Sequence, residues 1–306
     1  MISGVLLMAA CLLAAPVWGE TGHLEQAREL MAKKQWSQAL DHLKAATTQS
    51  PESVEAWDRT LECAGRLSRS FDQMEAAQKL LQWRPADIVL YNTIHALYGR
   101  QGQLERGLWY GEQAVRIAPK QAELHYNLGV TYSRLERNSK AIAAYQEAVR
   151  LDTEYLEARL NLADLYRKIG HSDEALATIE RVLGLNPDHY TARLSRGAIL
   201  EDLHRFSEAV ADYQVAIQSR PDQADGYRFL GLAYHVWGRN EDALSACQDG
   251  LTRFPKDIRL HACVAVVHQS LGNRQTAESE VATIRKLDPA FAARFTTSSR
   301  RDSSIR

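Results

Sequence analysis

Three side chains near the C-terminal end have types that could bind a metal ion. His261, Cys263 and His268 lie close together in the sequence, and imidazole and thiolate are protein ligands of zinc. Their spacing, H-x-C followed by a histidine five residues later, matches no zinc-ligand pattern, so we interpret them as packing residues. His95 has neither a nucleophile nor a partner carboxylate that the sequence identifies, as a catalytic base would need. We therefore predict no metal site and no catalytic residue.

The sequence also lacks the motifs of common enzyme classes. It contains no glycine-rich phosphate loop, no G-x-S-x-G nucleophile turn, no H-E-x-x-H and no C-x-x-C. The formal net charge of −1 and the pI near 6.8 argue against a nucleic-acid partner, which would favour a strongly basic face. We expect a protein without enzymatic activity or cofactor.

The spacing of the prolines indicates the repeated structural unit that must position the other side chains. Seven of the eight lie 34 residues apart or, across one gap that Thr153 fills, twice that distance. They are Pro51, Pro85, Pro119, Pro187, Pro221, Pro255 and Pro289. A period of this length is typical of a solenoid, whose repeats bury their apolar faces by stacking on neighbours. Counted from Glu20, eight repeats start at residues 20, 54, 88, 122, 156, 190, 224 and 258.

The pattern within a repeat predicts two helices. In residues 123–135 the apolar and small residues follow a helical stripe. Glycine recurs at position 15, where a turn must separate the helices, and the periodic proline stops the second helix. Small residues recur at positions 8 and 20, as expected where two helices cross closely. Each repeat is thus predicted to be helix, turn, helix.

This pattern resembles the tetratricopeptide repeat over residues 20–289. The match consists of an aromatic residue at position 4, Leu-Gly at 7 and 8, Tyr at 11, Ala at 20 and Pro at 32. Trp57, Leu128, Gly129 and Tyr132 are examples. The resemblance implies an all-α fold, a right-handed superhelical α-solenoid, with the first helices lining a concave groove.

The resemblance further implies that positions 2, 5, 6, 9, 12 and 13 face this groove. Amides at position 6 suit a peptide backbone, and the cations that recur at position 13 would attract an acidic segment. Alternatively, the basic residues at position 13 serve solubility alone. Positions 5 and 9 never read Lys and Asn, which disfavours the family's grip on a C-terminal carboxylate. The candidate protein-binding residues are Asn92, Arg100, Tyr126, Asn127, Arg134, Asn161, Asp164 and Lys168.

The first 19 residues predict export. They carry no charged side chain, and an apolar run ends at Pro16. Val17 and Gly19 are small enough at −3 and −1 for cleavage before Glu20, so we predict a signal peptide and a periplasmic or secreted protein. The alternative is an uncleaved membrane anchor with the repeats outside the cytoplasm, because no Lys or Arg precedes the run and its length approaches a bilayer core.

Three cysteines remain after the leader. Cys63, Cys247 and Cys263 fall in predicted helices, where cysteine usually packs as a small hydrophobe. Cys247 and Cys263 lie in adjacent repeats and could approach each other; the sequence leaves their pairing open, and we favour the unpaired state. In the tail, residues 290–306, Phe291 and Phe295 predict a short cap, and the polar remainder is predicted to be disordered.

These observations favour a protein–protein interaction scaffold. We predict that it acts outside the cytoplasm and holds a polypeptide segment in its concave groove. Two alternatives remain: a self-assembling structural component, and a polysaccharide-binding subunit of an envelope assembly or secretion machine. Tyr126 alone supplies an aromatic platform for the second. The sequence leaves the partner and the oligomeric state open.

Overall fold

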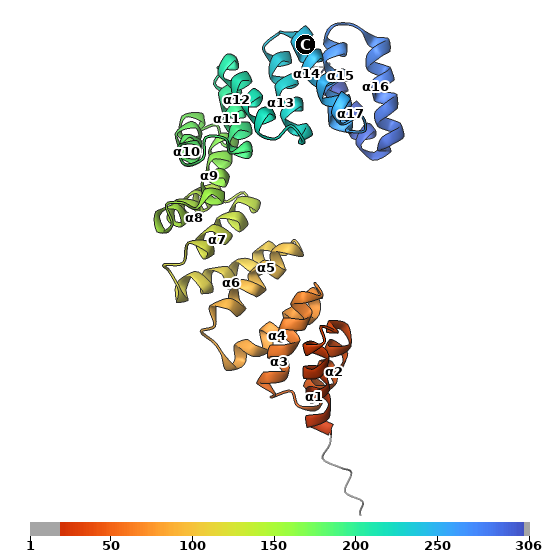
Figure 1. Ribbon diagram of the computed structural model, residues 1–306. Coiled ribbons are helices and arrows are strands. Elements are labelled where there is room, and N and C mark those ends of the chain that lie inside the picture. Colours follow the sequence, from red (N-terminus) through yellow and green to blue (C-terminus); the bar gives the residue numbers. More distant parts are fainter. Residues whose placement is uncertain (1–18, 303–306) are drawn as a thin grey trace, which may run out of the picture. The chain divides into compact units, whose positions relative to one another are not determined.

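The computed structural model describes residues 19–302, so the predicted leader, apart from its last residue, lies outside the described residues (Figure 1). Within this range the fold is all-α, with 17 helices and no strand. The first eight are α1 Gly19–Ala32, α2 Trp36–Gln49, α3 Val54–Arg66, α4 Ser70–Trp83, α5 Ile88–Arg100, α6 Leu104–Ile117, α7 Ala122–Arg134 and α8 Asn138–Leu151. They are followed by α9 Leu156–Lys168, α10 Ser172–Leu185, α11 Tyr190–Asp202, α12 Phe206–Ser219, α13 Ala224–Val236, α14 Asn240–Arg253, α15 Ile258–Ser270, α16 Arg274–Leu287 and α17 Pro289–Asp302. Between residues 19 and 302, no helix is both long enough and apolar enough to cross a membrane.

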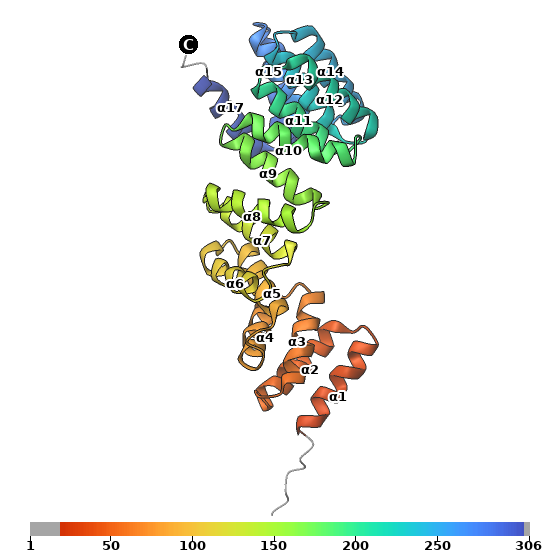
Figure 2. The same ribbon diagram turned by 90° about the vertical axis from the view of Figure 1, so that its left-hand side faces the viewer.

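The chain forms two compact units that are described separately. The N-terminal unit ends at Arg137 and holds α1 to α7; the C-terminal unit starts at Asn138 and holds α8 to α17. Within each unit consecutive helices pack against one another, as α1 to α4 do in Figures 1 and 2. From α3 onwards, the first helix of each predicted repeat starts at the residue where the proline register places that repeat.

A left-handed residue at position 15 turns the chain between the two helices of every repeat. Four repeats use glycine there, as Gly102 does with φ +73°. The other four use Lys34, Ser68, Glu136 and His204, with φ between 56° and 58°. The turn geometry is therefore common to all eight repeats, although glycine, which adopts it without steric cost, is present in only half of them.

In six repeats the side chain at position 4 donates a hydrogen bond to the backbone carbonyl oxygen six residues earlier. That carbonyl belongs to the periodic proline or, in one repeat, to Thr153. The donor differs in chemistry but always carries an N–H or O–H group. The pairs are Trp57 to Pro51 (2.8 Å), Tyr91 to Pro85 (3.2 Å), His125 to Pro119 (2.8 Å), Arg159 to Thr153 (2.7 Å), Arg193 to Pro187 (2.8 Å) and His261 to Pro255 (3.1 Å). This bond satisfies a loop carbonyl, so position 4 selects a donor rather than an aromatic ring. It also gives His261 a structural role.

His95 occupies position 8, where most repeats have glycine or alanine. It is only 4% exposed, and its Nε2 lies 2.7 Å from Thr131 Oγ1. The room comes from Gly111 on α6, because a Cβ there would lie 2.8 Å from the imidazole ring. His95 is therefore a packed core residue, in agreement with the sequence interpretation.

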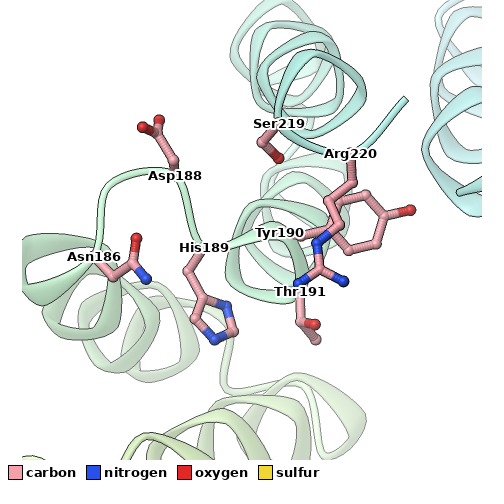
Figure 3. Close-up of a pocket in the computed structure, with 7 residues that line it drawn as sticks. All are labelled: Asn186, Asp188, His189, Tyr190, Thr191, Ser219 and Arg220. Carbon is pink, nitrogen blue, oxygen red and sulfur yellow. The ribbon is translucent and has the colours of Figure 1, made fainter. Parts of the chain in front are cut away.

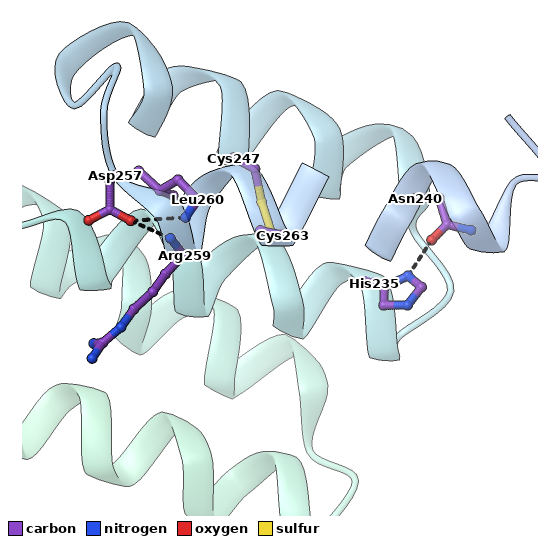
Figure 4. The surroundings of a disulfide bond; sticks show 7 residues. All are labelled: His235, Asn240, Cys247, Asp257, Arg259, Leu260 and Cys263. Carbon is purple, nitrogen blue, oxygen red and sulfur yellow. Dashed lines mark hydrogen bonds between the residues drawn. A yellow bond between two sulfur atoms is a disulfide. The ribbon is translucent and has the colours of Figure 1, made fainter. Parts of the chain in front are cut away.

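The structure pairs Cys247 with Cys263, so the prediction that they are unpaired is wrong (Figure 4). The disulfide joins α14 to α15, with the two Cα atoms 6.3 Å apart. Gly231 makes the space, because a Cβ on it would meet both sulfur atoms. Counting cysteines could not show this, since the pairing depends on which positions of adjacent repeats face one another. Cys63 is buried and unpaired.

The C-terminal segment also differs from expectation. Ala292 is buried against Ala262 and Ile284, with Phe291 and Phe295 packed beside them. Helix α17 then continues to Asp302, whereas the sequence predicts disorder soon after Phe295. Once a helix has nucleated on packed residues, each further residue adds a backbone hydrogen bond at little cost, which explains the extension.

Candidate protein-binding face

The eight predicted groove residues fall in both units. Five of them, on α5 and α7, belong to the N-terminal unit, and we call this surface the α5/α7 face: Asn92, Arg100, Tyr126, Asn127 and Arg134. Asn161, Asp164 and Lys168 lie on α9 in the C-terminal unit. Each group is described within its own unit.

Two amides meet on the α5/α7 face. Asn127 Nδ2 donates a hydrogen bond of 3.1 Å to Asn92 Oδ1, and both residues are half-buried. The bond uses one donor and one acceptor, so the amide N–H groups of Asn92 and the carbonyl oxygen of Asn127 lie outside it. The pair thus offers hydrogen-bonding groups of both kinds, the complement of a peptide backbone.

Two exposed arginines on this face are held by neutral acceptors. Arg100 Nη2 donates to Gln73 Oε1 (3.4 Å), and Arg134 Nη1 donates to the Gly99 carbonyl oxygen (2.9 Å). These bonds orient the guanidinium groups without cancelling their charge. Arg66, at the same position of the preceding repeat, differs, because it pairs with Glu62 at 3.3 Å. The cations at position 13 are therefore not equivalent: Arg66 is paired with a carboxylate, whereas Arg100 and Arg134 bond to neutral groups.

Several charged side chains of the first two repeats form ion pairs. Glu55 receives hydrogen bonds from Arg28 and Arg59, and these side chains lower the pKa of its carboxyl, Arg28 having the largest effect. Arg84 likewise pairs with Asp58. These ion pairs engage Arg28, Arg59 and Arg84, whereas Arg100 and Arg134 of the α5/α7 face bond to neutral acceptors.

The predicted residues of the C-terminal unit have mixed character. Asn161 is half-buried, whereas Asp164 and Lys168 are exposed residues of α9. Desolvation of the Asp164 carboxyl raises its pKa, while Arg167 and a hydrogen bond from Ser195 act in the opposite direction. Arg167 also pairs with Asp202 at 3.3 Å. The acidic and basic side chains of α9 and its neighbour thus offset one another. These residues therefore support an acidic ligand less strongly than the residues of the α5/α7 face do.

Among the described residues, the most buried ion cluster is one that the sequence did not predict. Asp212 on α12, 1% exposed, accepts hydrogen bonds from Arg193 Nη1 (2.6 Å) and from Arg196 Nε and Nη2 (2.6 and 2.7 Å). Asp212 also raises the pKa of Arg196. The sequence signal that could have predicted it is a basic residue at position 4 together with an acidic residue at position 23 of the same repeat. His261 and Glu280 occupy these two positions in the last repeat and form the same kind of pair. The cluster lies inside the repeat and is structural.

A polar hollow of about 420 Å³ opens beside the start of α11 (Figure 3). Its main polar groups already serve the fold. His189 Nδ1 accepts the Ala192 N–H at 3.2 Å and caps the helix, and the Tyr190 hydroxyl accepts the Gly226 N–H at 3.0 Å. The other lining residues are Asn186, Asp188, Thr191, Ser219 and Arg220. We assign no ligand to this hollow.

Comparisons with known proteins agree with the repeat fold. Family models of the tetratricopeptide repeat match residues 122–155, 160–224 and 200–258. No curated protein matches the chain in sequence. A tetratricopeptide repeat protein from Parabacteroides merdae has a similar structure, with a TM-score of 0.58 and 16% identity over 90% of this chain and 97% of that one.

Two further solved structures share the fold. The pilF protein of Pseudomonas aeruginosa has a TM-score of 0.54 and 14% identity, over 69% of this chain and 97% of that one. YrrB, described as a tetratricopeptide repeat protein with an unusual peptide-binding site, has a TM-score of 0.50 and 22% identity, over 61% of this chain and 96% of that one. At these identities the likeness shows the fold alone.

Proposed function

We propose that this protein is a non-enzymatic scaffold that binds an extended acidic polypeptide segment on its α5/α7 face. The chain belongs to the tetratricopeptide repeat family, and the fold of this family supports protein–protein interaction. The observation that carries this proposal is the pair of arginines 34 residues apart, Arg100 and Arg134, both oriented by neutral acceptors. Their charges are uncompensated by these bonds and are available to carboxylates.

The amides supply the second part of the proposed mechanism. Asn92 and Asn127 hold each other in place, so their remaining donor and acceptor groups need little ordering when a peptide backbone arrives. Charge attracts the segment and the amide pair fixes its backbone. The peptide-binding site named for the structurally similar YrrB supports this kind of ligand for the fold.

A labelled peptide of alternating glutamate and glycine tests the proposal by fluorescence anisotropy. Changing Arg100 and Arg134 to Glu together should weaken binding at least tenfold at low salt, and less as salt screens the charges. Changing Asn92 and Asn127 to Ala should weaken binding with little salt dependence, because amide contacts carry no net charge.

The matched control carries the same charge change elsewhere in the N-terminal unit. Arg116 and Lys120 are exposed on the last turn of α6 and in the loop after it, and changing both to Glu should leave binding nearly unchanged. Equal losses in the control and in the α5/α7 variants would contradict a defined face. Failure of the unaltered protein to bind the peptide would contradict the acidic ligand.

We also propose that the protein is exported. The Cys247–Cys263 disulfide supports this location, because disulfides persist in oxidising compartments and are rare in the cytosol. The apolar leader points the same way. Alkylation followed by intact-mass analysis of protein recovered from its cells should find a chain starting at Glu20. When the chain is alkylated in denaturant, which exposes the buried Cys63, and without reduction, Cys63 alone should be modified.

The same measurement separates the alternatives. A full-length chain in the membrane fraction with the disulfide intact would favour an uncleaved anchor. A full-length chain in the cytosol, with all its cysteines alkylated before reduction, would contradict export.

A further inference from the structure

Two hydrogen bonds join α5 to α7 on the α5/α7 face. One links the amides of Asn92 and Asn127 (3.1 Å), and the other links Arg134 to the Gly99 carbonyl oxygen (2.9 Å). On each helix the two bonded residues are seven positions apart, so the helices run in the same direction and the bonds lie about 10.5 Å apart along them. The function proposed above assigns no role to the surface between these bonds.

That surface is aliphatic. Ala96 follows Asn92 by four residues and precedes Arg100 by four, so all three lie on the same side of α5. Val130 occupies the same position, position 9, on α7. Ala96 is exposed and Val130 is half-buried. The α5/α7 face therefore has three bands in order along the helices: amides, two aliphatic side chains, and guanidinium groups.

The aliphatic band differs from position 9 of the first two repeats. There the position holds Arg28 on α1 and Glu62 on α3, and both side chains form ion pairs. On α5 and α7 the aliphatic residue precedes an arginine that bonds to a neutral acceptor. Charge and apolar surface are thus available together on these two helices.

The spacing of the bands matches that of an extended peptide. Four residues separate Ala96 from Arg100, and Val130 from Arg134, which is a rise of about 6 Å along each helix. Alternate side chains of an extended peptide lie on the same side, about 7 Å apart. An apolar side chain that contacts Ala96 and Val130 therefore places a carboxylate two residues away beside the guanidinium groups.

We infer that the acidic segment carries an apolar residue two positions from a glutamate or aspartate, in either chain direction. This inference rests on the proposed function and adds a sequence requirement to it. Burial of the apolar side chain contributes free energy that charge alone does not supply. An apolar residue directly beside the acid would point to the opposite side of the extended chain and could not reach the aliphatic band at the same time.

Three labelled peptides, capped at both ends and equal in charge, test this requirement by fluorescence anisotropy. The first repeats Gly-Leu-Gly-Glu twice, so every leucine lies two positions from a glutamate. The second repeats Gly-Gly-Leu-Glu twice and has the same composition with the two residues adjacent. The third repeats Gly-Gly-Gly-Glu twice and has no apolar residue. The first peptide should bind at least fivefold more tightly than either of the others.

The double variant Ala96→Ser, Val130→Thr makes the aliphatic band polar with little change of shape. It should bind all three peptides alike and keep the affinity of the unaltered chain for the third. The matched control is Ala45→Ser, Val115→Thr, on the second helices α2 and α6 of the same unit, and it should keep the preference for the first peptide. Thermal melts check that both variants fold.

The outcomes separate this inference from the proposed function. If the third peptide binds but the first binds no more tightly than the second or the third, the sequence requirement is wrong and the acidic ligand stands. A preference that survives in the folded Ala96→Ser, Val130→Thr variant would also overturn the inference. If no peptide binds the unaltered chain, the proposed function fails and this inference fails with it.

Discussion

Replacing Asp212 with Ala should lower the free energy of unfolding of the C-terminal unit by about 3–5 kcal/mol. The reason is the buried cluster in which one carboxylate accepts hydrogen bonds from both Arg193 and Arg196. Their side chains are only 18% and 25% exposed, so removing the carboxylate leaves two largely desolvated cations side by side. Urea unfolding, with hydrogen exchange of the α11 and α12 amides, measures the loss.

A matched control comes from the first turn of α12, in the same repeat. Glu208 pairs with Arg205 at 2.7 Å, but both side chains are substantially exposed. Glu208→Ala should therefore change the free energy of unfolding far less than Asp212→Ala does, because exposed ion pairs contribute little. If the two alanine variants lost similar stability, the buried cluster would not be the source of the effect. Replacing Asp212, Arg193 and Arg196 together with leucine should recover much of the loss, since no charge is then left unpaired.

Acidification should destabilise the N-terminal unit through His95. Burial lowers the pKa of His95 from 6.5 to about 4. Between these two values the unfolded chain binds a proton that the folded chain does not, so stability falls as the pH falls from about 6.5 to about 4. At about 1.4 kcal/mol for each pKa unit, the full effect of this shift is about 3 kcal/mol.

The measurement is the urea midpoint as a function of pH for the unaltered chain and for His95→Gln. Glutamine keeps a donor for Thr131, but it does not titrate. Carboxylates contribute to both curves alike, so the difference between them isolates His95. The stability of the unaltered chain relative to His95→Gln should therefore decrease as the pH falls from about 6.5 to about 4. Parallel curves over this window would show that His95 is not the titrating group.

Much of the fold could be predicted from the sequence because its signals are local and repeated. Proline stops a helix wherever it occurs, and the recurrence of one every 34 residues sets the start of α3 at Val54 and of α5 at Ile88. Turn geometry is less visible, since Ser68 and Glu136 adopt positive φ where glycine was the expected residue. Their tertiary context imposes a conformation that their residue types do not signal.

Features that depend on contacts between repeats were out of reach. The sequence showed Arg66, Arg100 and Arg134 as equivalents, yet their partners differ because the neighbouring side chains at each junction differ. Cys247 and Cys263 illustrate the same limit, since Gly231 lies in a third helix and decides whether there is space for the disulfide. The sequence identified each of these arginines and cysteines by type, but it could not identify the group that each one contacts.

The disulfide between α14 and α15 makes the junction between the last two repeats covalent, unlike the junction between the first two. In a linear chain of repeats, order is lost first at an end, where a repeat has one neighbour instead of two. Opening the junction between the seventh and eighth repeats would require breaking a covalent bond, whereas α1 and α2 are held to α3 by non-covalent contacts alone. Heat can therefore separate the first repeat by breaking non-covalent contacts alone, whereas α15 stays joined to α14 even where α16 or α17 unfolds.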